Sequence, residues 1–149
     1  MATIRLESTQ DAIDALEDYL DRLYERAVEI ADAHWQYVYE RDKKLDWDQR
    51  SQLYPRCNRK TGNLTFTLEW YKTRWVGAKA RGNRQRIKEY LPKPKDSYSY
   101  SEAKLSTLAR DWEADKVRET EAAFARIRRE SFQITRALLA LRAFVRADA

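Results

Sequence analysis

The sequence has few of the residues that build disulfides, tight loops and metal centres. Its 149 residues include one cysteine, one histidine, three glycines and three prolines. The lone Cys57 excludes an intramolecular disulfide framework and any multi-cysteine metal site. The chain also has no phosphate-cradling glycine loop, no serine elbow and no zinc spacing. We therefore predict that the protein is not an enzyme, has no catalytic residues, and needs no metal or other cofactor.

Long apolar runs are also absent. No segment approaches the roughly 18 consecutive apolar residues that a membrane span requires. Residues 1–5 do not begin the apolar core of a signal peptide. These absences predict a soluble, cytoplasmic protein with no membrane partner. The length is that of a single domain, residues 1–149, which is large enough to bury a core.

Charge is plentiful, and it is sorted by segment. Residues 1–50 hold 7 Lys and Arg against 13 Asp and Glu, a net charge of −6. Residues 51–100 hold 12 against 3, a net charge of +9, and residues 101–149 hold 10 against 8, a net charge of +2. Because fields act locally and are screened within roughly 10 Å, the basic middle segment is the informative one.

The two ends of the chain have the periodicity of long helices. Residues 9–43 place apolar or ambivalent residues at alternating steps of three and four, with Ser8 or Thr9 as N-cap. Residues 101–147 are predicted as a second helix, with the same spacing from Val117 onward and a phase slip near Asp115. We expect the two helices to pack antiparallel, within one chain or across a homo-oligomer. The apolar seams are Ile13, Leu16, Leu20, Leu23, Ala27, Ile30, His34 and Tyr37, and Val117, Thr120, Phe124, Ile127, Ser131, Ile134, Leu138, Leu141 and Val145.

Between the helices the apolar period changes to two, which is typical of β-strands. The pattern predicts strands at about residues 63–76 and 85–91, and a third at 52–59 that Pro55 would confine to an edge. Residues 52–91 thus form a basic β-meander. The predicted fold class is α+β, with two long antiparallel helices flanking a small antiparallel β-meander.

The densest group of cations lies on the second and third predicted strands and the loop between them. Lys72 and Arg74 share one strand face, and Arg84, Arg86 and Lys88 share a face of the next strand. We expect the paired strands to form a single cationic patch that enters a DNA major groove, roughly 12 Å wide. The alternative is a solvated hairpin whose charge prevents edge aggregation. The candidate nucleic-acid-binding residues are Lys72, Arg74, Trp75, Lys79, Arg81, Arg84, Arg86 and Lys88.

The aromatic residues of the meander divide by parity. Trp70 continues the face of Leu64, Phe66 and Leu68 and is predicted to be in the core. Trp75 and Tyr71 lie on the opposite parity, where they either stack on bases or pack against the helices.

Two other groups receive structural interpretations. His34 occupies a helix seam, so a hydrogen-bonded core histidine is expected rather than a catalytic one. The arginines of the second half of the last helix either extend the basic surface or, as we favour, pair with the acidic first helix.

Several short segments follow one another in a specific order between residues 62 and 130. They are EWYKTRWVG at 69–77, EYL at 89–91 with KPK at 93–95 and YSY at 98–100, DWE at 111–113, ETE at 119–121 and FARIRR at 124–129. In this order they resemble the MobI-type conjugative transfer proteins of integrative conjugative elements. The resemblance implies an auxiliary role, in which the protein helps a relaxase to assemble at the origin of transfer.

Two functions are consistent with these features. The first is a DNA-binding accessory factor for conjugative transfer, which binds origin-of-transfer double-stranded DNA and assists a relaxase or another relaxosome protein through its basic, aromatic β element. The alternative is a non-enzymatic protein-interaction adaptor built on a helical hairpin, whose basic strands dock an acidic protein.

Overall fold

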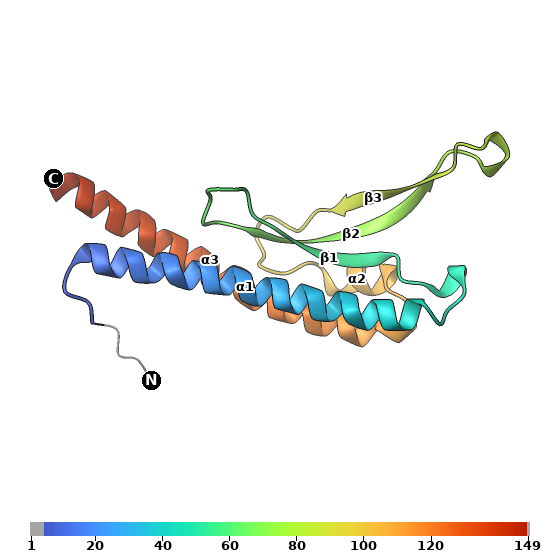
Figure 1. Ribbon diagram of the computed structural model, residues 1–149, viewed down its shortest axis with the longest axis horizontal. Helices are drawn as coiled ribbons and strands as arrows, with labels where there is room; N and C mark the ends of the chain where they lie inside the picture. The colour runs from blue at the N-terminus through green and yellow to red at the C-terminus, as the bar shows by residue number, and fades with distance from the viewer. Residues whose placement is uncertain (1–4, 149) are drawn as a thin grey trace.

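A pair of long helices and a three-stranded sheet form two layers in this computed structural model, which describes residues 5–148 (Figure 1). The long helices are α1 (Thr9–Asp42) and α3 (Ala114–Asp148), and the short α2 covers Glu102–Leu108. The strands are β1 (Leu53–Asn58), β2 (Thr67–Val76) and β3 (Gln85–Leu91). Three single turns of 3-10 helix complete the structure, namely η1 (Trp47–Gln49), η2 (Lys79–Arg81) and η3 (Asp111–Glu113).

The long helices run antiparallel and pack along the predicted seams (Figure 1). Helix α1 begins after Ser8, whose Oγ accepts a hydrogen bond from the Asp11 amide, as predicted for an N-cap. Arg142 pairs with Glu17 at 2.7 Å, so one of the arginines of α3 pairs with the acidic first helix as we favoured. None of the helices within residues 5–148 is both long and apolar enough to cross a membrane. The buried helix residues of the main core are Ile13, Leu20, Leu23, Ala27, Ala31, Phe124, Ile127 and Leu138.

The prediction of one continuous helix over residues 101–147 is wrong. The backbone of Ala109 and Arg110 is extended, and this separates α2 from η3 and α3. Tertiary hydrogen bonds hold the break open. The Arg110 guanidinium donates to the Arg50 carbonyl at 2.9 Å, and the Glu113 carboxylate accepts from the Ser51 hydroxyl at 2.7 Å. A helical pattern cannot reveal such partners, because they are distant in the sequence.

The sheet is an antiparallel meander in the order β1-β2-β3, with β1 at an edge as Pro55 required. Both long helices lie on the same face of the sheet (Figure 1). They precede and follow the sheet in the sequence, as predicted, but they do not lie on opposite sides of it. Strand β2 begins at Thr67, later than predicted, because Leu64 and Phe66 pack against the helix pair before the strand starts. The inner face, which the helices cover, carries Leu53, Pro55, Leu68, Trp70 and Leu91.

A buried polar network ties the sheet to α3. Trp70 is fully buried, as predicted, and its Nε1 donates to Glu121 at 2.9 Å. Glu121 also pairs with Arg128 at 2.9 Å, and Arg128 donates to the Leu68 carbonyl at 2.8 Å. Tyr100 donates to the Leu91 carbonyl at 2.7 Å. These side chains form hydrogen bonds with the backbone of β2 and of the end of β3, where strand pairing stops. Fewer free backbone groups therefore remain there to pair with another strand.

Candidate nucleic-acid interface

The β2–β3 hairpin extends beyond the rest of the sheet as a two-stranded arm (Figure 1). Strand β1 pairs with β2 no further than Lys72, with one additional hydrogen bond from the Thr73 amide, so residues 73–88, here called the arm, continue as two strands. Gly77 has a φ of 81°, and a Cβ there would collide with the Asn83 carbonyl. The turn of the arm therefore requires glycine at this position.

The strand register separates the predicted cationic patch into two groups. Trp75 pairs with Arg86 and Thr73 with Lys88, whereas Lys72 pairs with Glu89. Odd residues of β2 therefore share a face with even residues of β3, and the prediction of a single patch is wrong. Alternation within one strand does not determine which residues of β2 and β3 share a face, because the register between the strands depends on the conformation of the connecting loop.

Lys72 and Arg74 lie on the inner-face side of the hairpin. They approach the Glu89 carboxylate at 3.5 and 3.6 Å, respectively. Lys72 is thus partly neutralised near the base of the hairpin, while Arg74 remains exposed. These two residues do not face the groove described below.

The opposite, outer face of the sheet alternates aromatic rings with cations. The Tyr54 and Tyr71 rings are nearly parallel, with centroids 6.2 Å apart, and Tyr90 lies 5.6 Å from Tyr71. The Lys88 ammonium lies 5.2 Å from the Tyr54 ring centre, and the Arg56 guanidinium lies 5.6 Å from that of Tyr71. Rings paired with cations in this way suit both base stacking and phosphate binding.

Trp75 is exposed on the arm. The base-stacking prediction required this exposure, whereas the alternative, packing against the helices, would have buried the ring. Its side chain is 38% accessible, and the Arg84 guanidinium lies 4.5 Å from its ring centre. Trp47, from η1, approaches it with ring centroids 5.3 Å apart. Trp47 is not among the predicted site residues. The signal that could have indicated it is its position just before the basic segment and three residues from Arg50, whose guanidinium lies 5.8 Å from the Trp47 ring centre.

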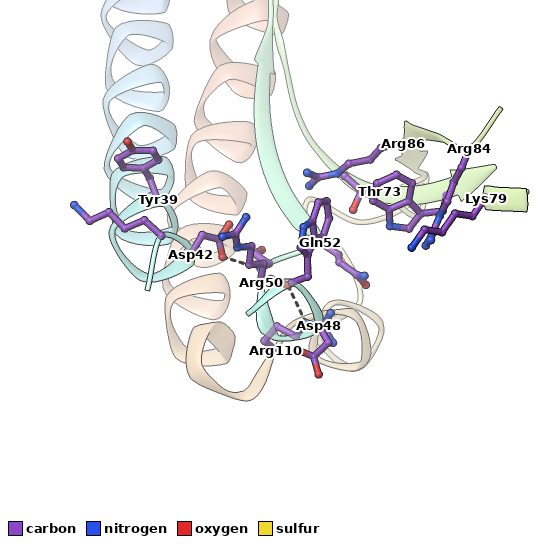
Figure 2. Close-up of a pocket in the computed structure, with 14 residues that line it drawn as sticks. Tyr39, Asp42, Asp48, Arg50, Gln52, Thr73, Lys79, Arg84, Arg86 and Arg110 are labelled. Carbon is purple, nitrogen blue, oxygen red and sulfur yellow. Dashed lines mark hydrogen bonds between the residues drawn. The ribbon is translucent and has the colours of Figure 1, made fainter. Parts of the chain in front are cut away.

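A groove of about 1000 Å³ lies between the arm, the end of α1 and η1 (Figure 2). Figure 2 shows Lys79, Arg84 and Arg86 on one side of it and Tyr39 and Asp42 on the other. Asp42 is already engaged, because it accepts a hydrogen bond from the Ser51 amide at 2.9 Å. The cations that line the groove outnumber its two carboxylates, Asp42 and Asp48; they are Lys43, Arg50, Lys79, Arg84, Arg86 and Arg110. The groove therefore favours an anionic ligand.

Buried ionisable groups lie beneath this surface. Burial raises the pKa of Glu113 to about 7, although the Ser51 hydroxyl partly offsets this effect. Burial, assisted by Lys116, lowers the pKa of His34 to about 4. The His34 Nδ1 lies 2.7 Å from the Thr120 hydroxyl, but its Nε2 has no partner among the described residues, so only half of the expected hydrogen bonding is present.

Burial also raises the pKa of the Cys57 thiol to about 12, which is unfavourable for a nucleophile. Within residues 5–148, no three His, Cys, Asp or Glu side chains lie close enough together to hold a metal ion.

The structure distributes the predicted site residues over four places, and the first is the inner-face side of the hairpin, which holds Lys72 and Arg74. Trp75, Lys79, Arg84 and Arg86 line the groove, and Lys88 lies on the outer face next to it. Arg81 is exposed near the tip of the arm. The groove residues that the prediction missed are Lys43, Trp47, Arg50 and Arg110, which come from segments outside the meander and join it only in the folded chain.

Comparison with known proteins identifies the family. No curated protein and no solved structure matches the chain. A family model described as "MobI protein" matches residues 23–142, which is most of the chain, and it confirms the resemblance found in the ordered segments. The chain therefore belongs to the MobI family of accessory mobilisation proteins, which act in conjugative transfer.

Proposed function

We propose that this MobI protein is a non-enzymatic DNA-binding factor that binds origin-of-transfer DNA and assists a relaxase. The observation that carries this proposal is the projecting arm. It holds the exposed cations Arg74, Lys79, Arg81, Arg84 and Arg86 away from the helices, where a duplex can reach them. The protein would act in the cytoplasm, where the transferred DNA is processed.

Most of these charges are not neutralised within the protein. Among residues 5–148, no carboxylate lies within ion-pairing distance of Lys79, Arg81, Arg84 or Arg86, and Arg74 approaches Glu89 at only 3.6 Å. Phosphate binding by such side chains releases counterions and gives salt-dependent affinity. Protection against edge aggregation would need fewer charges than these, and it would need none at the tip of the arm, where Lys79 and Arg81 lie.

The shape of the arm also suits duplex DNA. A two-stranded ribbon fits into a major groove roughly 12 Å wide, and arginine forms bidentate hydrogen bonds with guanine and phosphate. Because of the register between β2 and β3, cations lie on both faces of the arm. A ribbon inserted edge-on or flat therefore meets phosphates on either wall of the groove.

The test is binding of the purified protein to duplex DNA from the origin of transfer of its own element, with footprinting to locate the site. Replacing Arg74 and Arg81 together with alanine removes two exposed cations that do not line the groove. If both contact phosphates, the magnitude of the salt slope should fall by about 1.8. The double variant Arg126→Ala, Arg146→Ala removes the same charge from the exposed surface of α3 and is the matched control. An unchanged affinity and slope in the arm variant would contradict the proposal.

In the alternative, an adaptor built on a helical hairpin docks an acidic protein with its basic strands, and one observation gives the helices a second surface for association. The end of α3 extends past the sheet, and Leu139 and Phe144 there are 59% and 58% exposed (Figure 1). Such side chains favour a second copy or a protein partner. Sedimentation of a Leu139→Glu, Phe144→Glu variant tests this association, and a helical adaptor would lose it without any change in DNA affinity.

A further inference from the structure

Three hollows that share lining residues follow one another along β1, between α1 and the outer face of the sheet. The groove of about 1000 Å³ shares Ser51, Thr73 and Arg86 with a hollow of about 300 Å³. That hollow shares Tyr54 and Lys88 with a third of about 480 Å³, which lies between α1 and β1. We call this connected surface the track. It runs from the arm toward the middle of α1, farther than a small ligand would need.

Three exposed tryptophans line the track, and they come from three different elements. Trp35 of α1 is 42% exposed, Trp47 of η1 is 61% exposed and Trp75 of β2 is 38% exposed. The other two tryptophans of the chain, Trp70 and Trp112, are not exposed in this way. Large aromatic side chains are normally buried, so their convergence on a single surface indicates a ligand with flat rings.

The tryptophans are held in place by neighbouring groups. The Trp35 indole donates to the Pro55 carbonyl at 3.2 Å, and its ring lies 5.1 Å from that of Tyr54. The Trp47 and Trp75 rings are tilted by 52° instead of forming a closed flat stack. The rings are thus positioned before any ligand arrives, which lowers the entropy lost on binding.

Cations accompany the rings along the whole track. Its lining includes eight Lys and Arg side chains against three aspartates, Asp32, Asp42 and Asp48. Lys88 lies midway along it, and Arg56 lies in the third hollow. A ligand that follows the track therefore carries negative charge at intervals as well as flat rings.

We infer that the track binds an unpaired strand of DNA, with bases stacked on Trp35, Trp47 and Trp75 and phosphates beside the cations. This inference rests on the proposed DNA-binding function and names its substrate class. A duplex presents phosphates and base edges but hides its base faces, so it leaves the tryptophans without partners. An acidic peptide would satisfy the cations but supplies few flat rings. A single strand satisfies both groups.

The experiment measures the affinity of the full chain for a fluorescently labelled oligothymidine of roughly 12 nucleotides, a length within the usual site sizes of single-strand binders. An abasic oligomer with the same number of phosphates is the matched ligand. We expect the abasic strand to bind much more weakly. We expect Trp47→Ala and Trp75→Ala each to weaken oligothymidine binding by about 5-fold to 150-fold, the range that loss of one base–aromatic stack produces.

Two controls keep the result specific. Phe132→Ala removes an aromatic ring that is 47% exposed and lies outside the track, and it should leave oligothymidine affinity unchanged. Trp47→Tyr keeps an aromatic ring and should retain most of the affinity, while circular dichroism of each variant verifies the fold. Equal binding of the abasic strand, or tryptophan variants within twofold of the parent protein, would overturn the inference.

Duplex binding separates this inference from the function on which it rests. If duplex DNA binds through Arg74 and Arg81 while oligothymidine does not bind, the proposed function stands and the track is not a single-strand site. If neither DNA binds but a polyglutamate peptide does, both proposals are wrong and the surface docks an acidic protein. Loss of oligothymidine binding in Trp47→Ala, with duplex affinity retained, would support the inference.

Discussion

Trp70 and Trp75 belong to the same strand but lie on opposite faces of the sheet. Trp70 is fully buried against the helices, and its indole donates to the Glu121 carboxylate. Trp75 is 38% exposed, and its ring contacts Arg84 and Trp47. The same residue type therefore anchors the core on one face and offers a ring to solvent on the other. What distinguishes the two faces is whether the helices cover them.

The cations differ between the faces in the same way. Arg128, at the inner-face edge, is largely buried. All its N–H groups donate hydrogen bonds, to the Glu121 carboxylate and to the carbonyls of Leu68 and Tyr98. Arg86, on the outer face, is exposed and lines the groove. Arg128 is thus satisfied within the protein, whereas Arg86 remains available to a ligand.

The largest expected effect is on stability, from Trp70→Ala. This change leaves a cavity and removes a hydrogen bond from the buried Glu121, so the free energy of unfolding should fall by about 3–5 kcal/mol. Urea denaturation followed by far-ultraviolet circular dichroism measures it. Trp70→Phe keeps most of the volume and should cost less. A loss below about 1 kcal/mol would mean that the inner face does not depend on this ring.

Arg128→Met should have the next largest effect. It leaves the Glu121 carboxylate buried without its cation, and breaking such a pair costs about 3–5 kcal/mol. Some of this loss should be avoided here, because Trp70 and Tyr100 still donate to Glu121. Arg86→Met is the outer-face control, and its free energy of unfolding should lie within about 0.5 kcal/mol of the parent protein. Equal losses for the two variants would erase the contrast between the faces.

The pH dependence of stability tests the ionisable groups buried in the helical layer. The folded state keeps Glu113 protonated up to about pH 7, against 4.5 for an ordinary glutamate, so its contribution to stability falls as pH rises between these values. His34 titrates near 4 instead of 6.5, so its contribution rises with pH between these values. The two effects oppose each other between pH 4.5 and 6.5.

Removing either ionisable group should therefore reveal the pH dependence of stability that the other group contributes. In Glu113→Gln the free energy of unfolding should increase with pH across this window, and in His34→Gln it should decrease. Each slope should approach about 1.4 kcal/mol per pH unit. Chemical denaturation at a series of pH values provides the measurement. Parallel pH profiles for both variants would contradict the opposing assignment.

The smallest effect on stability should come from Trp75→Ala. An exposed ring on a projecting arm contributes little to the core, so the free energy of unfolding should change by less than about 1 kcal/mol. Thermal unfolding measures this, with Trp70→Ala as the reference for a buried ring on the same strand. A loss as large as that of Trp70→Ala would show that the arm packs as core, and it would remove the distinction between the two faces.

The sequence predicts much of the fold because its signals are local. The steps of three and four in the helices and the alternation around Leu64–Trp70 depend on neighbouring residues, and the helix seams and the burial of Trp70 followed from them. Family membership also follows from the sequence, through the ordered segments between residues 69 and 129 and the match over residues 23–142.

The errors have a common cause, which is dependence on distant partners. The break at Ala109 and Arg110 requires Arg50 and Ser51, which the helical pattern of residues 101–147 does not include. The division of the cations between two faces requires the pairing of Trp75 with Arg86, which the loop sets. Trp47 and Arg110 join the groove from opposite sides of the meander in the sequence.

The sequence alone determined the helical seams, the strands, the excess of positive charge in residues 51–100 and the family of the chain, because each depends on composition or short-range order. Tertiary structure alone decided which rings and cations face the same space. Parity within one strand assigns side chains to two faces, but only pairing between strands and packing of the helices decide which face is covered. That physical choice separates Trp70 from Trp75 and brings Trp35, Trp47 and Trp75 to one track.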